Sequence, residues 1–155
     1  MQHFIKTIIL RHRRENLKKC SLRGLENRPD MQFFTYPTAK LPDLKGYVLL
    51  SLDAPVLTED DKDFGIFLLD ATWRWADKMD QFVQQHAIIE KRSLPGHFKT
   101  AYPRRQLDCP DPDAGLASIE ALYIAYHILG RESQNLLDHY HWKDQFLSLN
   151  SNHLK

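Results

Sequence analysis

The sequence contains few cysteines and glycines and no long apolar run. Its two cysteines, Cys20 and Cys109, cannot build a disulfide framework, and they lack CxxC spacing. So low a cysteine content is typical of proteins from a reducing compartment. Six glycines, with neither a P-loop nor a GxGxxG motif, disfavour a dinucleotide-binding fold. No stretch approaches the roughly 20 apolar residues of a membrane span, and residues 1–10 show no signal-peptide pattern. We therefore expect a cytoplasmic protein with no membrane partner.

Length and composition predict one ordinary globular domain. The chain has 155 residues, about the size of a single domain, and we expect residues 1–155 to fold as one unit and to be monomeric. Hydrophobic residues make up 43% and charged residues 26%, which is far from the composition of a disordered chain. The net charge of +1 excludes attraction to nucleic acid through bulk charge, but it leaves room for a local basic face.

The balanced total conceals two basic segments. Residues 1–28 carry a net charge of +6 and residues 91–105 carry +5, whereas residues 53–63 carry −4. Charged runs are commonly solvated faces, and that interpretation stays open for either segment alone. Two basic segments beside one site would instead form a surface that follows a phosphate backbone.

Apolar runs alternate with helical patterns along the chain. We predict strands over 4–10, 31–36, 47–52 and 65–70, and a weaker one over 98–102. The runs inside 47–52 and 65–70 are continuous, which is typical of strands buried on both faces of a parallel sheet. Helices are predicted over 72–85, 117–129 and 133–149, with Thr58 capping a further acidic turn. The alternation predicts an α/β fold with a mostly parallel sheet flanked by helices.

The motif Asp70-Ala71-Thr72-Trp73 follows a buried strand directly. An acid at the carboxyl end of a parallel strand lies where α/β sheets bind ligands. The amides at the start of the next helix can hold an anion, and the Trp73 ring can attract a sulfonium or ammonium cation. The alternative is that Asp70 is a second capping residue and Trp73 belongs to the core.

Two further patterns support only limited conclusions. Residues 115–121 contain Ser118 and Glu120 at the start of a helix, which fits either an ordinary cap or a ligand loop that enters a helix. His139 and His141 are two residues apart, so on a helix they point in different directions and do not indicate a metal site.

Seven short motifs occur in the order found in one family. They are Lys18-Lys19-Cys20-Ser21, Leu52-Asp53, Thr58-Glu59-Asp60-Asp61, Leu68–Trp73, Arg92-Ser93-Leu94-Pro95, Ser118-Ile119-Glu120-Ala121, and the tail Trp142–Asn150. This order resembles the small-subunit rRNA aminocarboxypropyltransferases of ribosome biogenesis. The chain also resembles the DTW-domain tRNA-uridine aminocarboxypropyltransferases, because Asp-Ala-Thr-Trp and Tyr102-Pro103-Arg104-Arg105 are closer to that branch. Lys-Lys-Cys-Ser and the tail are closer to the rRNA branch, so rRNA or a precursor ribosome is the favoured partner and tRNA the alternative.

The resemblance implies a SPOUT-like fold with a C-terminal trefoil knot. Residues 1–64 would form an N-terminal α/β part with an RNA-facing basic segment, and residues 65–155 a knotted part that binds S-adenosyl-L-methionine (SAM). The implied activity is transfer of the 3-amino-3-carboxypropyl (acp) group of SAM to a uridine-type base nitrogen. The expected SAM-contacting residues are Ser21, Leu52, Asp70, Trp73, Ala76, Leu94, Tyr102, Leu116 and Ser118.

Each expected role has a chemical reason. Asp70 is the candidate base or orienting group for the pyrimidine imide nitrogen. Trp73 and Ala76 lie one helical turn apart and could wall off the methyl group of SAM, so that Cγ is the exposed carbon. Phosphates would be bound by Arg11, Arg14, Lys18, Lys19 and Arg105. The alternatives are a catalytically inert RNA- or ribosome-binding module of the same fold and a SPOUT-like RNA methyltransferase.

Overall fold

A computed structural model describes residues 5–14, 21–37, 40–71, 73–102 and 116–154, with the backbone alone at Trp73 and Arg74. Its elements, in chain order, are β1 (Thr7–His12), β2 (Met31–Tyr36), β3 (Tyr47–Leu50), the 3-10 turn η1 (Glu59–Asp61), β4 (Gly65–Asp70), α1 (Trp73–His86), β5 (Glu90–Arg92), α2 (Ser118–Leu129) and α3 (Lys143–Leu149).

The five strands form one parallel sheet in the order β2-β1-β4-β3-β5. The inner strands β1 and β4 are the most buried, as expected for strands covered on both faces. The predicted α/β class with a mostly parallel sheet is confirmed. Because β4 lies between β1 and β3, residues before and after position 64 contribute strands to the same sheet.

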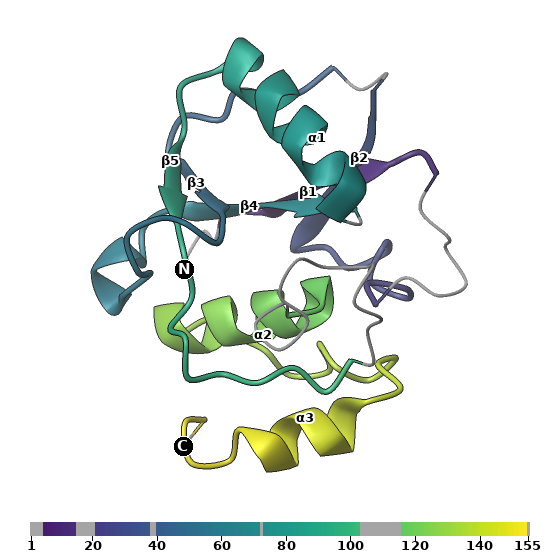
Figure 1. Ribbon diagram of the computed structural model, residues 1–155, viewed down its shortest axis with the longest axis vertical. Helices are drawn as coiled ribbons and strands as arrows, with labels where there is room; N and C mark the ends of the chain where they lie inside the picture. Colours follow the sequence, from purple (N-terminus) through teal and green to yellow (C-terminus); the bar gives the residue numbers. More distant parts are fainter. Residues whose placement is uncertain (1–4, 15–20, 38–39, 72, 103–115, 155) are drawn as a thin grey trace.

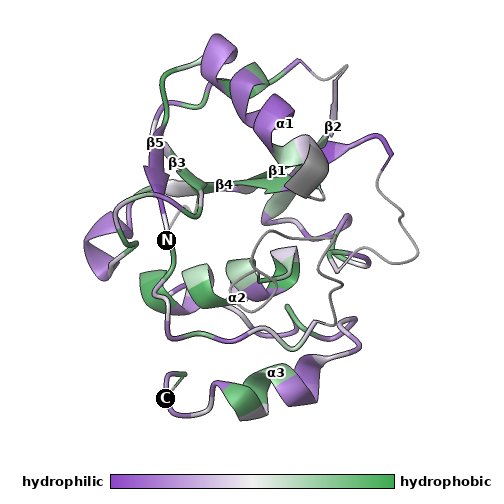
Figure 2. Cartoon of the chain, viewed as in Figure 1, coloured by the Kyte–Doolittle hydropathy of each residue, from purple (hydrophilic) through white to green (hydrophobic). Residues whose placement is uncertain are grey.

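Helices cover both faces of the sheet (Figure 1). Alternate residues of the central strands point to opposite sides. Ile8 and Leu10 of β1 pack in a cluster with Met79 and Val83 of α1. The intervening Ile9 packs in a second cluster, which contains residues of α2 and α3. Figure 2 shows apolar residues in the inner part of the sheet and over much of α2, and polar residues over β5, η1 and much of α1.

Two element predictions are wrong. Residues 98–102 form no strand; the edge strand is Glu90–Arg92, whose three charged residues hide the strand pattern. The last helix is limited to Lys143–Leu149, because residues 134–139 form turns in which Asn135 adopts a φ of 66°. The third strand also ends at Leu50, two residues before the predicted end.

The predicted cap at Thr58 is confirmed. Thr58 caps η1, accepting a hydrogen bond from the Asp60 amide at 3.3 Å and donating its own amide to Asp61 at 3.1 Å. Gly130 ends α2 in the left-handed conformation at φ 69°. Among the described residues, no helix combines the length and apolar character needed to cross a membrane.

Candidate functional site

The carboxyl ends of β1 and β4 bring two opposite charges together. Arg11 and Asp70 are register partners on these neighbouring strands. Side chains in register on parallel strands point to the same face. Both residues are two positions beyond core residues of the α2 face, Ile9 and Leu68, so they also point toward α2. Strand periodicity and register therefore create the pair.

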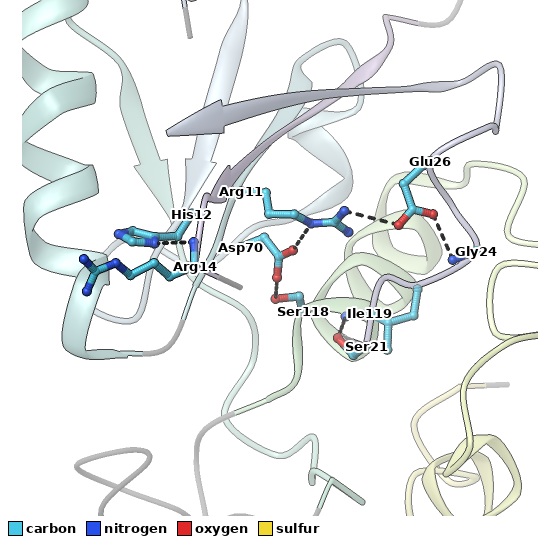
Figure 3. Close-up of polar contacts among 9 residues, drawn as sticks. All are labelled: Arg11, His12, Arg14, Ser21, Gly24, Glu26, Asp70, Ser118 and Ile119. Carbon is cyan, nitrogen blue, oxygen red and sulfur yellow. Dashed lines mark hydrogen bonds and ion pairs between the residues drawn. The ribbon is translucent and has the colours of Figure 1, made fainter. Parts of the chain in front are cut away.

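Arg11 is the centre of a chain of ion pairs (Figure 3). Its Nε donates to Asp70 Oδ2 at 2.9 Å, and its Nη1 lies 3.2 Å from Glu26 Oε1. The guanidinium also lies over the ring of Phe33, 4.6 Å from its centroid. Only 11% of the Arg11 side chain and 4% of the Asp70 side chain are exposed. Arg11 thus connects Asp70 with Glu26 inside the protein. The sequence had instead suggested that it contacts phosphates.

The start of α2 joins the same cluster. Ser118 Oγ donates to Asp70 Oδ1 at 3.2 Å, and the Ile119 amide donates to Ser21 Oγ at 3.2 Å. Three residues that were expected to contact SAM, Ser21, Asp70 and Ser118, therefore meet where β4 ends and α2 begins. They are far apart in the sequence, and only folding brings them together.

Glu26 is a member of this cluster that sequence reasoning missed. It accepts from Arg11 at Oε1 and from the Gly24 amide at Oε2, at 2.9 Å. Burial alone would raise the pKa of Glu26, but hydrogen bonds from its own backbone amide, the Arg11 side chain and the Gly24 amide, together with the charge of Arg11, lower it. The only available signal was an isolated acid in a basic segment, and nothing in the sequence pairs it with Arg11.

His12 points to the opposite face, toward α1 (Figure 3). Its ring stacks on Trp75 with centroids 4.6 Å apart, and its Nδ1 accepts the Arg14 amide at 3.0 Å. Burial, and then the charges of Arg13 and Arg14, lower the pKa of His12 from its usual value. The exposed Arg14 has its guanidinium 5.8 Å from the Trp75 ring centroid. Basic and aromatic groups thus lie together beside the carboxyl end of β1 and the start of α1.

The apolar residues expected at the SAM site are only partly covered. Leu94, Tyr102 and Leu116 pack against the α2-side core but keep some exposure, whereas Leu52 is 75% exposed in the bend after β3. Leu52 and Leu94 each lie two residues beyond a register pair, Leu50 and Arg92, at the carboxyl edge of neighbouring strands.

The start of α1 supplies the remaining described residues of this group. Trp73 is its first residue, three positions after the end of β4, and Ala76 is half-buried one turn later. The partly open side chains of Ala76, Leu94, Tyr102 and Leu116, together with the hydroxyl groups of Ser21 and Ser118, fit a ligand with apolar and polar parts, such as SAM. Lys18, Lys19 and Arg105 lie outside the described residues, as does the proline-containing stretch around Cys109. Within the part of the chain that is described, no group of three or more His, Cys, Asp or Glu residues could hold a metal ion.

Comparison with known proteins identifies the fold. No protein-family profile matches the chain, and no curated protein sequence gives a significant match. The solved structure of the SAM-dependent rRNA:acp-transferase Tsr3 from Vulcanisaeta distributa is similar to this chain, with a TM-score of 0.68 and 22% sequence identity. The alignment covers 97% of this chain and 82% of that chain. The likeness extends over the whole α/β fold with its parallel sheet and flanking helices.

Proposed function

We propose that this protein is a SAM-dependent RNA-modifying transferase that moves the acp group to a uridine-type base nitrogen. The observation that carries the proposal is the cluster of Arg11, Asp70, Ser118 and Ser21 at the junction of β4 and α2. That cluster lies in a fold similar to an rRNA:acp-transferase. Substrates of α/β proteins bind at the carboxyl ends of the strands, which is where these residues meet.

The SAM site would be lined by two groups of residues. The polar group consists of Ser21, Asp70 and Ser118, which can interact with the amino-acid part of SAM. The apolar group consists of Leu52, Trp73, Ala76, Leu94, Tyr102 and Leu116. Leu94, Tyr102 and Leu116 are half-buried and packed against the core, and such side chains are suited to hold an adenine ring or a methyl group, because they are open to a ligand on one side and supported on the other.

The choice of the transferred group depends on positioning. SAM carries electrophilic carbons at its methyl group and at Cγ of its methionine part. We propose that Trp73 and Ala76, one turn apart at the start of α1, cover the methyl group and leave Cγ open to attack. The imide nitrogen of the base would form the new bond to Cγ while the Cγ–sulfur bond breaks, which releases methylthioadenosine and one proton.

Asp70 is better suited to orienting than to accepting that proton. Its Oδ2 accepts from Arg11 and its Oδ1 accepts from Ser118. A general base must lie within hydrogen-bond reach of the reacting nitrogen. The bonds to Arg11 and Ser118 hold the two oxygens of Asp70 toward β1 and α2, so we propose that it orients the first turn of α2 and the groups that hold SAM.

RNA would be bound by the basic residues around the end of β1. Arg14 is exposed beside Trp75, and Lys18, Lys19 and Arg105 extend the basic segments in the sequence. Arg11 is left out of this group because its guanidinium already pairs with Asp70 and Glu26. We propose rRNA or a precursor ribosome as the substrate, with tRNA as the alternative supported by the Asp70–Trp73 motif.

The trefoil knot is part of the same proposal. Its support is the path of the chain: after β5 the chain leaves the sheet and passes between α2 and α3, where Ala101 bonds to Glu120 and Lys99 to Asn150 (Figure 1). Helix α2 then begins beside Asp70, at the end of β4. A knot at this point would keep the residues around Leu94, Tyr102 and Leu116 close to the end of β4. We also propose that the protein is a cytoplasmic monomer.

A pair of tryptophan variants tests the SAM site. Trp73→Ala removes the proposed methyl-group wall, whereas Trp75→Ala removes a ring from the same helix that stacks on His12. Residues two apart on a helix point in different directions, so the two changes act on different surroundings. Loss of a cation–π contact of roughly 0.5–2 kcal/mol would weaken SAM binding about 2–30-fold in Trp73→Ala.

Calorimetric titration with SAM and a denaturant midpoint are measured for both variants and the parent. We expect Trp75→Ala to bind SAM as tightly as the parent. If Trp73 is only a core residue, its truncation costs about 3–5 kcal/mol of stability, and the folded variant keeps the parental affinity. That result would contradict the proposed SAM site, and failure of the parent to bind SAM would favour an inert RNA-binding module.

A further inference from the structure

Glu120 is a completely buried carboxylate in the first turn of α2. Its Oε1 accepts hydrogen bonds from the Ala117 amide at 2.8 Å and from Thr100 Oγ1 at 2.6 Å. Its Oε2 accepts from the Ala101 amide at 2.8 Å and from the Tyr140 hydroxyl at 2.9 Å. The carboxylate therefore joins three parts of the chain: the segment before position 103, the start of α2 and the turn before α3.

Only a carboxylate can make this set of bonds. Each oxygen receives one backbone N–H, and a backbone N–H can only donate. A glutamine has a single acceptor oxygen, so its NH₂ group would face either the Ala101 or the Ala117 amide, donor against donor. A favourable interaction with the helix dipole does not explain the arrangement, because that interaction requires neither burial nor contact with residues 100 and 101.

The two bridged amides are next to residues of the proposed SAM site. Ala101 precedes Tyr102, and Ala117 follows Leu116. Thr100 adds a second connection on the Tyr102 side, because its hydroxyl accepts the Tyr102 amide at 3.0 Å while it donates to Glu120. Glu120 thus fixes the backbone beside Tyr102 relative to the backbone beside Leu116.

Asn150 holds the same segment from its other side. The buried Asn150 side chain accepts the Lys99 amide at 2.8 Å and donates to the Lys99 carbonyl at 2.9 Å. Its Nδ2 also donates to the Phe146 carbonyl at 2.9 Å, which ties the segment to α3. Residues 99–102 are therefore fixed between α2 and the end of α3.

We infer that Glu120 is a positioning residue of the proposed SAM site, which sets the distance between Tyr102 and Leu116 without touching the substrate. This inference rests on the proposed function. Asn150 supports the same segment. This last residue of the tail motif therefore has a role in the site, although it lies far from β4 in the sequence. Glu120 then does more than cap α2, because it also joins the start of this helix to residues 100 and 101.

The test compares Glu120→Gln with Tyr140→Phe. Both remove a hydrogen bond to the buried side chain at position 120, but only Glu120→Gln breaks the bridge between the two backbone amides. At a temperature where circular dichroism shows each variant folded, we expect the dissociation constant for SAM to rise about tenfold in Glu120→Gln and to stay within about twofold in Tyr140→Phe. Hydrogen exchange should accelerate at residues 99–102 and 116–119 in Glu120→Gln alone.

Each outcome decides the question. Parental SAM affinity in folded Glu120→Gln, or equal losses in both variants, would overturn the positioning role. If Glu120→Gln does not fold, Thr100→Val replaces it: this change removes the hydroxyl link to Tyr102, and we expect about threefold weaker SAM binding, with unchanged affinity overturning the inference. Failure of the parent protein to bind SAM would overturn the proposed function and the inference together.

Discussion

The Arg11–Asp70 ion pair joins the neighbouring strands β1 and β4. Both side chains are largely withdrawn from solvent, at 11% and 4% exposure, and they connect the central strands with the first turn of α2. Removing one member of a buried pair leaves an uncompensated charge, which costs more than the pair itself contributes. Arg11 also contacts Glu26, but that carboxylate is 38% exposed and its interaction is weakened by solvent.

Asp70→Asn and Glu26→Gln should therefore differ in stability. We expect Asp70→Asn to lower the free energy of unfolding by about 3 kcal/mol and Glu26→Gln by less than about 1 kcal/mol. Guanidinium denaturation of both variants measures the difference. Equal, small losses would indicate that the Arg11–Asp70 pair is well solvated, contrary to its burial.

His12 gives the fold a dependence on pH. Its pKa is lowered in the folded protein, by burial first and then by Arg13 and Arg14, so below about pH 6.5 the unfolded chain binds the proton more readily. Stability should fall as the pH drops through this value. Protonation of Nδ1 would also oppose the Arg14 amide that donates to it.

Replacement of His12 by asparagine should reduce this pH dependence. An asparagine oxygen can still accept the Arg14 amide but does not titrate. Denaturant midpoints of the parent and His12→Asn are compared at about pH 7.5 and pH 5.5. We expect the parent to lose more stability than the variant; an equal loss would show that other groups carry the pH dependence.

At the scale of elements, the end of α2 depends on one backbone conformation. Gly130 has a φ of 69° and its amide bonds back to the helix, whereas Gly96 has an ordinary φ; a Cβ would meet no atom at either position. Gly130→Ala should therefore destabilise the protein by about 1 kcal/mol through backbone strain alone. Gly96→Ala should be neutral or slightly stabilising. Thermal unfolding of the two variants tests the assignment, and equal midpoints would contradict it.

Sequence patterns located the elements whose burial is regular. The continuous apolar runs of β3 and β4 and the stripe of α2 reflect burial by the sheet and its covering helices, so they were visible in the sequence. The edge strand Glu90–Arg92 was missed because its solvent-facing side chains are charged. The helix over 133–149 was overextended because nothing in the sequence reveals the turn at Asn135.

For the whole molecule, the site was only partly predictable. Asp70 at the end of a buried strand follows from local pattern, but its pairing with Arg11 depends on β1 lying beside β4, which no local pattern specifies. The contact of Ser21 with α2 and the bonds of Glu120 to residues 100 and 101 likewise depend on tertiary structure. The fold class can be predicted from the spacing of apolar residues in the sequence. The site can be predicted only when the order of the strands in the sheet is known.

The central claim is that the acp group, and not the methyl group, is transferred from SAM to RNA. The most direct measurement incubates the protein with SAM and bulk cellular RNA, and then analyses both the nucleosides and the small products by mass spectrometry. We predict a uridine-type nucleoside that has gained the acp group, together with methylthioadenosine in equal amount. A methylated nucleoside with S-adenosylhomocysteine, or no modified nucleoside although SAM is bound, would contradict the claim.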